Sequence, residues 1–154
     1  MMGVSAQKTS INVAIATWEW PAYFDPKLKA EGIRLNISKW RRPAPNTIPW
    51  DAKAAGLYMI CTLSKHEAEQ QGYSESLMLD FEGNVAEGTS ANIFFKDKNN
   101  ELHTPTPDSF LNGITRQAVI ELANGDLIIG GKNAFLDGGY GGAASIVKLS
   151  FHEQ

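Results

Sequence analysis

Residues 44–58 read Ala-Pro-Asn-Thr-Ile-Pro-Trp-Asp-Ala-Lys-Ala-Ala-Gly-Leu-Tyr, a proline-rich arm that leads into a helical pattern. Pro45 and Pro49 fix φ and disfavour helix in the residues before them, so the arm is predicted to be stiff and extended. Apolar residues then recur at a helical period, which predicts a helix over residues 51–71. Lys53 therefore lies near the junction of arm and helix, between residues too small to crowd its amine.

Lys53 has two interpretations. Most lysines near a helix start are simply solvated. An amine that is kept away from water can instead be uncharged and nucleophilic, and can form a Schiff base with a carbonyl compound. The choice between these interpretations depends on whether other residues of the chain could form a site with Lys53.

Predicted strands alternate with predicted helices up to residue 123. The expected strands are residues 11–18, 33–40, 76–81, 93–95 and 101–104, and a second helix is expected from about residue 113. This alternation predicts a mixed α/β (α+β) domain over residues 1–123. Residues 124–154 are rich in paired glycines and show little amphipathic pattern, so they are predicted to form a separate tail.

The composition is that of an ordinary globular chain with one domain. The 154 residues are 43% hydrophobic and 20% charged, and the net charge of −3 gives no support for nucleic acid or an anionic membrane as a partner. Cys61 is the only cysteine, so no internal disulfide can form and a reducing compartment is expected. No apolar run approaches a membrane span and no signal peptide is recognisable, so we expect a cytoplasmic protein.

Several common catalytic motifs are absent from the sequence. The three histidines and one cysteine show no metal-ligand spacing, so no metal site is expected. The paired glycines of the tail lack the patterns of nucleotide sites, and neither Ser90 nor Ser109 has the context of a nucleophile elbow. These absences disfavour metallohydrolases, nucleotide-binding enzymes and serine hydrolases.

Two other features could bind charged groups. Residues 112–116 (Asn-Gly-Ile-Thr-Arg) begin the second predicted helix, where unpaired N–H groups and the dipole favour a phosphate, although an ordinary capped helix is the alternative. Glu87 precedes a predicted buried strand, so its carboxylate lies either in a partly dry place or in a solvated turn. A lysine amine, a carboxylate and a phosphate-binding helix start are together what a pyridoxal phosphate site requires.

Residues 18–26 form a loop with several aromatic side chains, Trp20 and Tyr23 among them. Aromatic residues this close in sequence can form a small hydrophobic cluster. They can also line a pocket for an apolar ligand.

The sequence resembles the class IV aminotransferases of the branched-chain amino acid type. Four segments in the family's order carry the resemblance: residues 44–49, 53–58, 87–92 and 111–116. The resemblance covers about residues 2–123 and implies the D-amino acid aminotransferase-like fold. Family members are about twice as long, so the chain is expected to be the central part of their large cofactor domain, truncated at both ends, with an unrelated tail.

The resemblance also implies the cofactor, pyridoxal 5'-phosphate, and a role for each matching residue. Lys53 would be the Schiff-base lysine and the proton shuttle. Tyr58 would form a hydrogen bond with the cofactor's phenolic oxygen, and Glu87 would pair with its pyridine nitrogen. The implied phosphate and ring contacts are Leu111, Gly113, Ile114 and Thr115. The implied substrate-pocket residues are Met2, Val4, Trp20 and Tyr23.

The implied activity is transfer of the amino group of leucine, isoleucine or valine to 2-oxoglutarate, in an enzyme that is a homo-oligomer when intact. A D-amino acid aminotransferase and an aminodeoxychorismate lyase share the lysine, glutamate and phosphate segments, and residues 44–49 favour the branched-chain group over both. A third alternative is a truncated remnant without catalytic activity, because the small domain that completes the substrate site in the family has no counterpart in this sequence.

Overall fold

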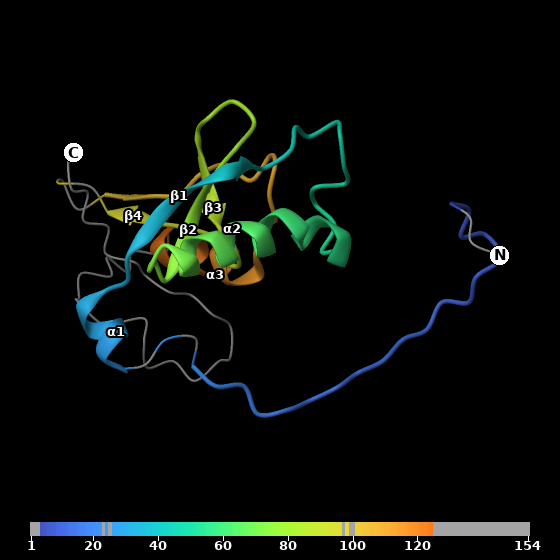
Figure 1. The fold of residues 1–154 in the computed structure, drawn as a ribbon, viewed down its shortest axis with the longest axis horizontal. Coiled ribbons are helices and arrows are strands. Elements are labelled where there is room, and N and C mark those ends of the chain that lie inside the picture. Colours follow the sequence, from blue (N-terminus) through green and yellow to red (C-terminus); the bar gives the residue numbers. More distant parts are fainter. Residues whose placement is uncertain (1–3, 23, 25, 97, 99–100, 125–154) are drawn as a thin grey trace.

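The computed structural model describes residues 4–22, 24, 26–96, 98 and 101–124 (Figure 1). Its elements in chain order are α1 (Pro26–Glu31), β1 (Leu35–Arg41), the 3-10 helix η1 (Ala55–Tyr58), α2 (Met59–Gln70), β2 (Glu75–Leu79), β3 (Val85–Gly88), β4 (Phe95–Lys96), β5 (Leu102–His103) and α3 (Ile114–Asn124). The predicted glycine-rich tail lies, apart from its first residue, outside the described residues.

The main sheet has three strands in the order β1-β2-β3. β1 and β2 are parallel and are joined through α2, which packs on both, whereas β2 and β3 are antiparallel (Figure 1). β4 and β5 form a separate antiparallel pair. Parallel neighbours need a crossover connection, and the helical period between the two strands supplies it. The predicted mixed α/β fold is confirmed.

The end of α2 agrees with the sequence, and its start does not. Gly72 has φ of 79°, its N–H donates to the Glu69 carbonyl at 3.0 Å, and the Tyr73 N–H donates to the Ala68 carbonyl at 2.9 Å. This pair of bonds is a Schellman ending, which favours glycine. The predicted start at residue 51 is wrong, because a turn in which the Ala52 N–H bonds the Pro49 carbonyl precedes η1.

The apolar core is formed by side chains of α2, the main sheet and α3. Its buried members come from every one of these elements and from the loops before β4 and α3: Cys61, Ala68, Leu77, Met78, Ala86, Ile93, Phe110 and Val119. The fully buried Met78 and Phe110 are the largest of them. Since burial of such side chains stabilises by roughly 2 kcal/mol each, the core fixes the strands that carry the polar site described below.

The strand predicted over residues 11–18 is not present. This segment has no regular structure and lies apart from the sheet (Figure 1), and the Ile15 side chain is 94% exposed. β-branched residues favour a strand only where neighbouring backbone can pair with them. Within the described part of the chain, no strand pairs with this segment.

The remaining predicted elements are found with shifted bounds. β1, β2, β5 and α3 lie where strands and a helix were predicted, and β4 begins two residues late. β3 occupies residues for which no strand was predicted. The six-residue helix α1 was not predicted, although Pro26 at its first position and Gly32 with φ of 89° after its end are helix signals. No helix in the described ranges combines the length and apolar character needed to cross a membrane.

Candidate active site

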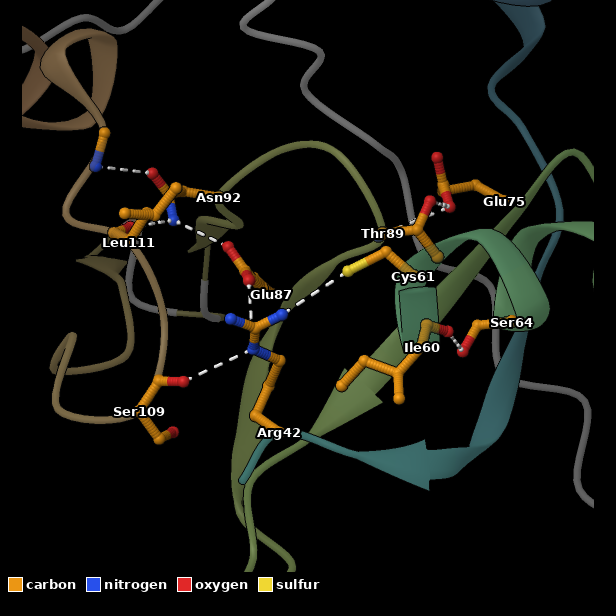
Figure 2. A network of polar contacts seen from close by, with 11 residues as sticks. Arg42, Ile60, Cys61, Ser64, Glu75, Glu87, Thr89, Asn92, Ser109 and Leu111 are labelled. Carbon is orange, nitrogen blue, oxygen red and sulfur yellow. Dashed lines mark hydrogen bonds and ion pairs between the residues drawn. The ribbon is translucent and has the colours of Figure 1, made fainter. Parts of the chain in front are cut away.

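A buried ion pair joins the ends of two strands. Arg42 follows β1 and Glu87 lies on β3, with 4% and 9% of their surfaces exposed. The Arg42 Nε atom is 3.5 Å from Glu87 Oε1. Figure 2 shows the two side chains facing each other. Charges out of water are costly unless their other polar atoms are also satisfied. Two of the three guanidinium nitrogens of Arg42 have a hydrogen-bond partner, because Nε donates to the Ser109 carbonyl at 3.3 Å and Nη1 to Cys61 Sγ at 3.4 Å.

Asn92 connects the same carboxylate to the start of α3 (Figure 2). Its Nδ2 donates to Glu87 Oε2 at 3.2 Å and to the Leu111 carbonyl at 2.9 Å. Its Oδ1 accepts from the Gly113 N–H at 3.1 Å. A Cβ on Gly113 would come to 2.4 Å from that Oδ1, so any other residue at this position would have to displace the Asn92 side chain.

The first backbone N–H groups of α3 have no hydrogen-bond acceptor among the described residues. The first backbone bond of the helix is from the Gln117 N–H to the Gly113 carbonyl at 3.0 Å. The N–H groups of the three preceding helical positions therefore have no acceptor within the helix. Arg116 is buried, and its side chain donates to Asn112 Oδ1 and the Pro105 carbonyl, both at 2.9 Å. Arg116 thus anchors the helix start, whereas the backbone donors remain open to an anion.

Burial changes the proton affinity of the side chains in this network. Burial raises the pKa of Glu87 to about 7, although the Arg42 charge lowers it. Burial also raises the pKa of Tyr58 and of Cys61, and the Glu87 charge raises both further. Tyr58 at the end of η1 is therefore within electrostatic reach of the carboxylate. A cation or hydrogen-bond donor next to Glu87 would favour its ionised form.

The structure brings together one part of the predicted site. Glu87, Leu111 and Gly113 meet through Asn92, and Tyr58 interacts electrostatically with Glu87. The side chains of Ile114 and Thr115 are exposed at the helix start, as expected if their backbone N–H groups are the binding atoms.

Among the described residues, no hydrogen bond or ion pair joins Lys53 or Val4 to this network. Lys53 is exposed just before η1, and within the described ranges it makes no hydrogen bond or ion pair. Trp20 is 62% exposed and packs near Trp18 with ring centroids 5.9 Å apart, and Val4 is fully exposed. Two further predicted substrate residues lie outside the described residues: Met2 and Tyr23.

Sequence reasoning missed Arg42, Asn92 and Ser109 as parts of the site. Asn92 ends one of the four segments on which the family resemblance rests, and Arg42 lies two residues before the proline arm. Their positions in the sequence were the available signal. A cavity of about 350 Å³ beside α3 contains none of the predicted site residues; it is lined by Phe94, Leu102, His103, Thr104, Ile120 and Ala123.

Comparison with known proteins places the chain in a family. The model of the family described as amino-transferase class IV matches residues 2–129. The chain is 47% identical over 116 residues to a probable branched-chain-amino-acid aminotransferase of Rickettsia bellii, covering 75% of this chain and 38% of the relative. It is 44% identical over 115 residues to the branched-chain-amino-acid aminotransferase of Escherichia coli K12, covering 74% of this chain and 37% of that enzyme.

A solved structure agrees with this placement. The branched-chain amino acid aminotransferase from Thermobaculum terrenum, in its PLP form, superposes with a TM-score of 0.57 at 36% identity, over 64% of this chain and 33% of that one. The chain thus spans little more than a third of the length of the curated relatives it matches. Since the family model matches most of the sequence, the chain belongs to the class IV amino-transferases.

Proposed function

We propose that this chain carries part of the pyridoxal 5'-phosphate site of a branched-chain amino acid aminotransferase, which transfers the amino group of leucine, isoleucine or valine to 2-oxoglutarate. The observation that carries the proposal is the buried Glu87 carboxylate tied through Asn92 to the open helix start at Gly113. The names of the relatives support the reaction, and the PLP form of the Thermobaculum terrenum enzyme supports the cofactor, since PLP is pyridoxal 5'-phosphate.

The residues present fit such a cofactor. Each oxygen of a carboxylate can accept about two hydrogen bonds. Glu87 Oε1 contacts Arg42 and Oε2 contacts Asn92, so the carboxylate retains acceptor capacity for the N–H of a pyridine ring. The free backbone donors at the start of α3 have the chemistry that a phosphate group needs.

In this proposal each residue has a separate role. Glu87 holds a proton at the ring nitrogen, and Tyr58 donates a hydrogen bond to the phenolic oxygen. The backbone N–H groups of Ile114 and Thr115 bind the phosphate beside Gly113, and Leu111 packs against the ring. Lys53 attaches the cofactor and carries the proton that moves during amino-group transfer. When bound, the cofactor supplies an electron-accepting ring.

The substrate side of the site, the domain limits and the assembly are also part of the proposal. Met2, Val4, Trp20 and Tyr23 would line a pocket for a branched aliphatic side chain, for which apolar and aromatic residues are suited. Residues 1–123 would be the partial cofactor domain. A homo-oligomer in the intact enzyme and a cytoplasmic location complete the proposal; the single cysteine supports the location.

Cofactor attachment can be tested on the 154-residue chain itself. Adding pyridoxal 5'-phosphate, reducing with borohydride and mapping the peptides should place the cofactor on Lys53. Lys53→Ala should abolish both the label and the visible absorption of the bound cofactor. Lys39→Ala is the matched control, because Lys39 is an exposed lysine paired with Glu67 at 3.0 Å, and it should leave the label unchanged. Labelling that survives Lys53→Ala contradicts the role of Lys53.

Turnover with a panel of amino donors tests the reaction. L-leucine, L-isoleucine and L-valine should be accepted with 2-oxoglutarate in preference to D-alanine. A preference for D-alanine would replace the branched-chain reaction by a D-amino acid aminotransferase. Cofactor binding without any turnover would show that the chain is a non-catalytic remnant of the family.

A further inference from the structure

One side chain, that of Asn92, touches both the Glu87 carboxylate and the start of α3. Its three bonds use both sides of one planar amide. The Nδ2 side faces two oxygen acceptors, from Glu87 and Leu111, and the Oδ1 side faces the N–H of Gly113. The opposite orientation of the amide would place Oδ1 against two oxygens, so the network assigns the orientation.

The contacts on the two oxygens of Glu87 differ in kind. Oε1 faces the charged guanidinium of Arg42, which supplies the electrostatic compensation. Oε2 faces the uncharged amide of Asn92, which adds little charge but directs the carboxylate through a hydrogen bond. Arg42 therefore stabilises the carboxylate, and Asn92 fixes where its second oxygen points.

The bonds of Asn92 to Leu111 and Gly113 fix the other end. Leu111 and Gly113 flank the turn that leads into α3, and Asn92 holds both by their backbone atoms at 2.9 and 3.1 Å. The approach at Gly113 is so close that an added Cβ would displace the amide, so the turn and the amide are in direct contact. The two ends are thus held at a spacing set by one amide group.

We propose that Asn92 is a positioning residue that fixes the distance and orientation between the Glu87 carboxylate and the α3 start, and thereby matches the two ends to one rigid phosphorylated pyridine. The inference rests on the cofactor proposed above. A rigid ligand can bind the carboxylate and the helix start at the same time only if the protein already holds the two at the correct spacing. Such preorganisation lowers the free-energy cost of binding. Asn92 itself need not touch the ligand.

The test measures binding of pyridoxamine 5'-phosphate to the full chain, by change in fluorescence or by calorimetry. This ligand lacks an aldehyde, so its binding does not require attachment to Lys53. Asn92→Ala should weaken its binding by about tenfold or more, since a tenfold change corresponds to one or two hydrogen bonds. Pyridoxamine and inorganic phosphate each reach only one end, and their binding should weaken less than that of the phosphorylated ligand.

Asn92→Asp should make ligand binding depend on pH, an effect that is not expected if Asn92 has only a structural role. The introduced carboxylate keeps the acceptor for Gly113 but places an oxygen against Glu87 Oε2 and the Leu111 carbonyl. Two adjacent carboxylates can share one proton, which restores the hydrogen bond at low pH. Ligand binding by Asn92→Asp should therefore recover, relative to Asn92→Ala at the same pH, as the pH is lowered.

Asn84→Ala is the matched control. Asn84 Nδ2 also donates to a carboxylate, Asp80 Oδ2 at 3.0 Å, but in the turn between β2 and β3. Loss of this bond leaves both ends of the proposed site in place. Ligand affinity should therefore stay within about twofold of the wild-type value, less than the change expected for one hydrogen bond.

Three results would overturn the inference. Wild-type affinity in Asn92→Ala excludes a positioning role. Equal weakening of all three ligands, together with loss of folded circular dichroism and no pH recovery in Asn92→Asp, reduces Asn92 to a structural residue. Failure of the wild-type chain to bind pyridoxamine 5'-phosphate at all refutes the proposed cofactor site, and the inference with it.

Discussion

The carboxylate end and the lysine end of the proposed site are held in different ways. Glu87 is buried, and both of its oxygens contact side chains from other parts of the chain, Arg42 and Asn92. Lys53 is exposed on the segment between β1 and η1, which extends away from the sheet in Figure 1, and it has no polar partner within the described chain. The fold therefore determines the position of the carboxylate, whereas local turns alone determine the position of the lysine.

Among changes in the proposed site, removal of Arg42 should have the largest effect on stability. Arg42→Met keeps much of the side-chain volume but leaves the buried Glu87 without its cation. Breaking a buried ion pair by removing one partner costs about 3–5 kcal/mol. The hydrogen bonds from Arg42 to Ser109 and Cys61 would also be lost. We expect a loss of about 3 kcal/mol in the free energy of unfolding, measured by urea denaturation, because Glu87 can take up a proton and limit the cost.

Lys53→Ala is the control for the lysine end. An exposed side chain without a polar partner contributes little, so the free energy of unfolding should change by less than about 0.5 kcal/mol. Similar losses in Arg42→Met and Lys53→Ala would contradict the difference between the two ends.

The pH dependence of stability should report Glu87. Burial raises the pKa of Glu87 to about 7, so the folded protein keeps a proton that the unfolded chain loses near pH 4. Because the folded state binds more protons in this range, stability should fall as the pH rises from about 4.5 to 7. The slope from this group should be on the order of 1 kcal/mol per pH unit.

Glu87→Gln isolates that contribution. It removes the titrating group and leaves the other carboxylates in place, so the difference between the two pH profiles belongs to Glu87. The difference in unfolding free energy between the two proteins should change with pH only between the ordinary pKa of a glutamate and about pH 7. Below and above this range the difference should be constant. A profile of Glu87→Gln that runs parallel to wild type throughout would show that Glu87 titrates normally.

The sequence revealed the local parts of this site and not its long-range contacts. The sequence left Glu87 open between a partly dry place and a solvated turn, and the structure places it on β3. The start of α3 could be predicted because a helix start leaves signals in neighbouring residues. The contact of Arg42 with Glu87 joins residues far apart in the chain, and a single sequence contains no signal for such a pair. The same limit explains the wrong strand at residues 11–18, since a strand depends on a partner as well as on its own residues.

Substitution of one glycine at each end tests the same difference between the carboxylate end and the lysine end. A Cβ at Gly113 would meet Asn92 Oδ1 at 2.4 Å, whereas a Cβ at Gly56, three residues after Lys53, meets nothing within 4 Å. Gly113→Ala should lose about 1–2 kcal/mol of unfolding free energy, because it disrupts a part-buried hydrogen bond. Gly56→Ala should be neutral or slightly stabilising, because alanine restricts the unfolded chain. Thermal unfolding of both variants checks the difference, and equal effects would contradict it.

The smallest effect should come from the segment before α1. Ile15→Ala truncates a side chain that is 94% exposed, so the free energy of unfolding should change by less than about 0.5 kcal/mol. Leu77→Ala makes the same kind of truncation in the buried core and should cost about 3 kcal/mol. Urea denaturation of the two variants compares them directly. A loss above about 1 kcal/mol in Ile15→Ala would mean that residues 11–18 bury their apolar side chains in solution, and the strand predicted there would then have to be considered again together with its partner.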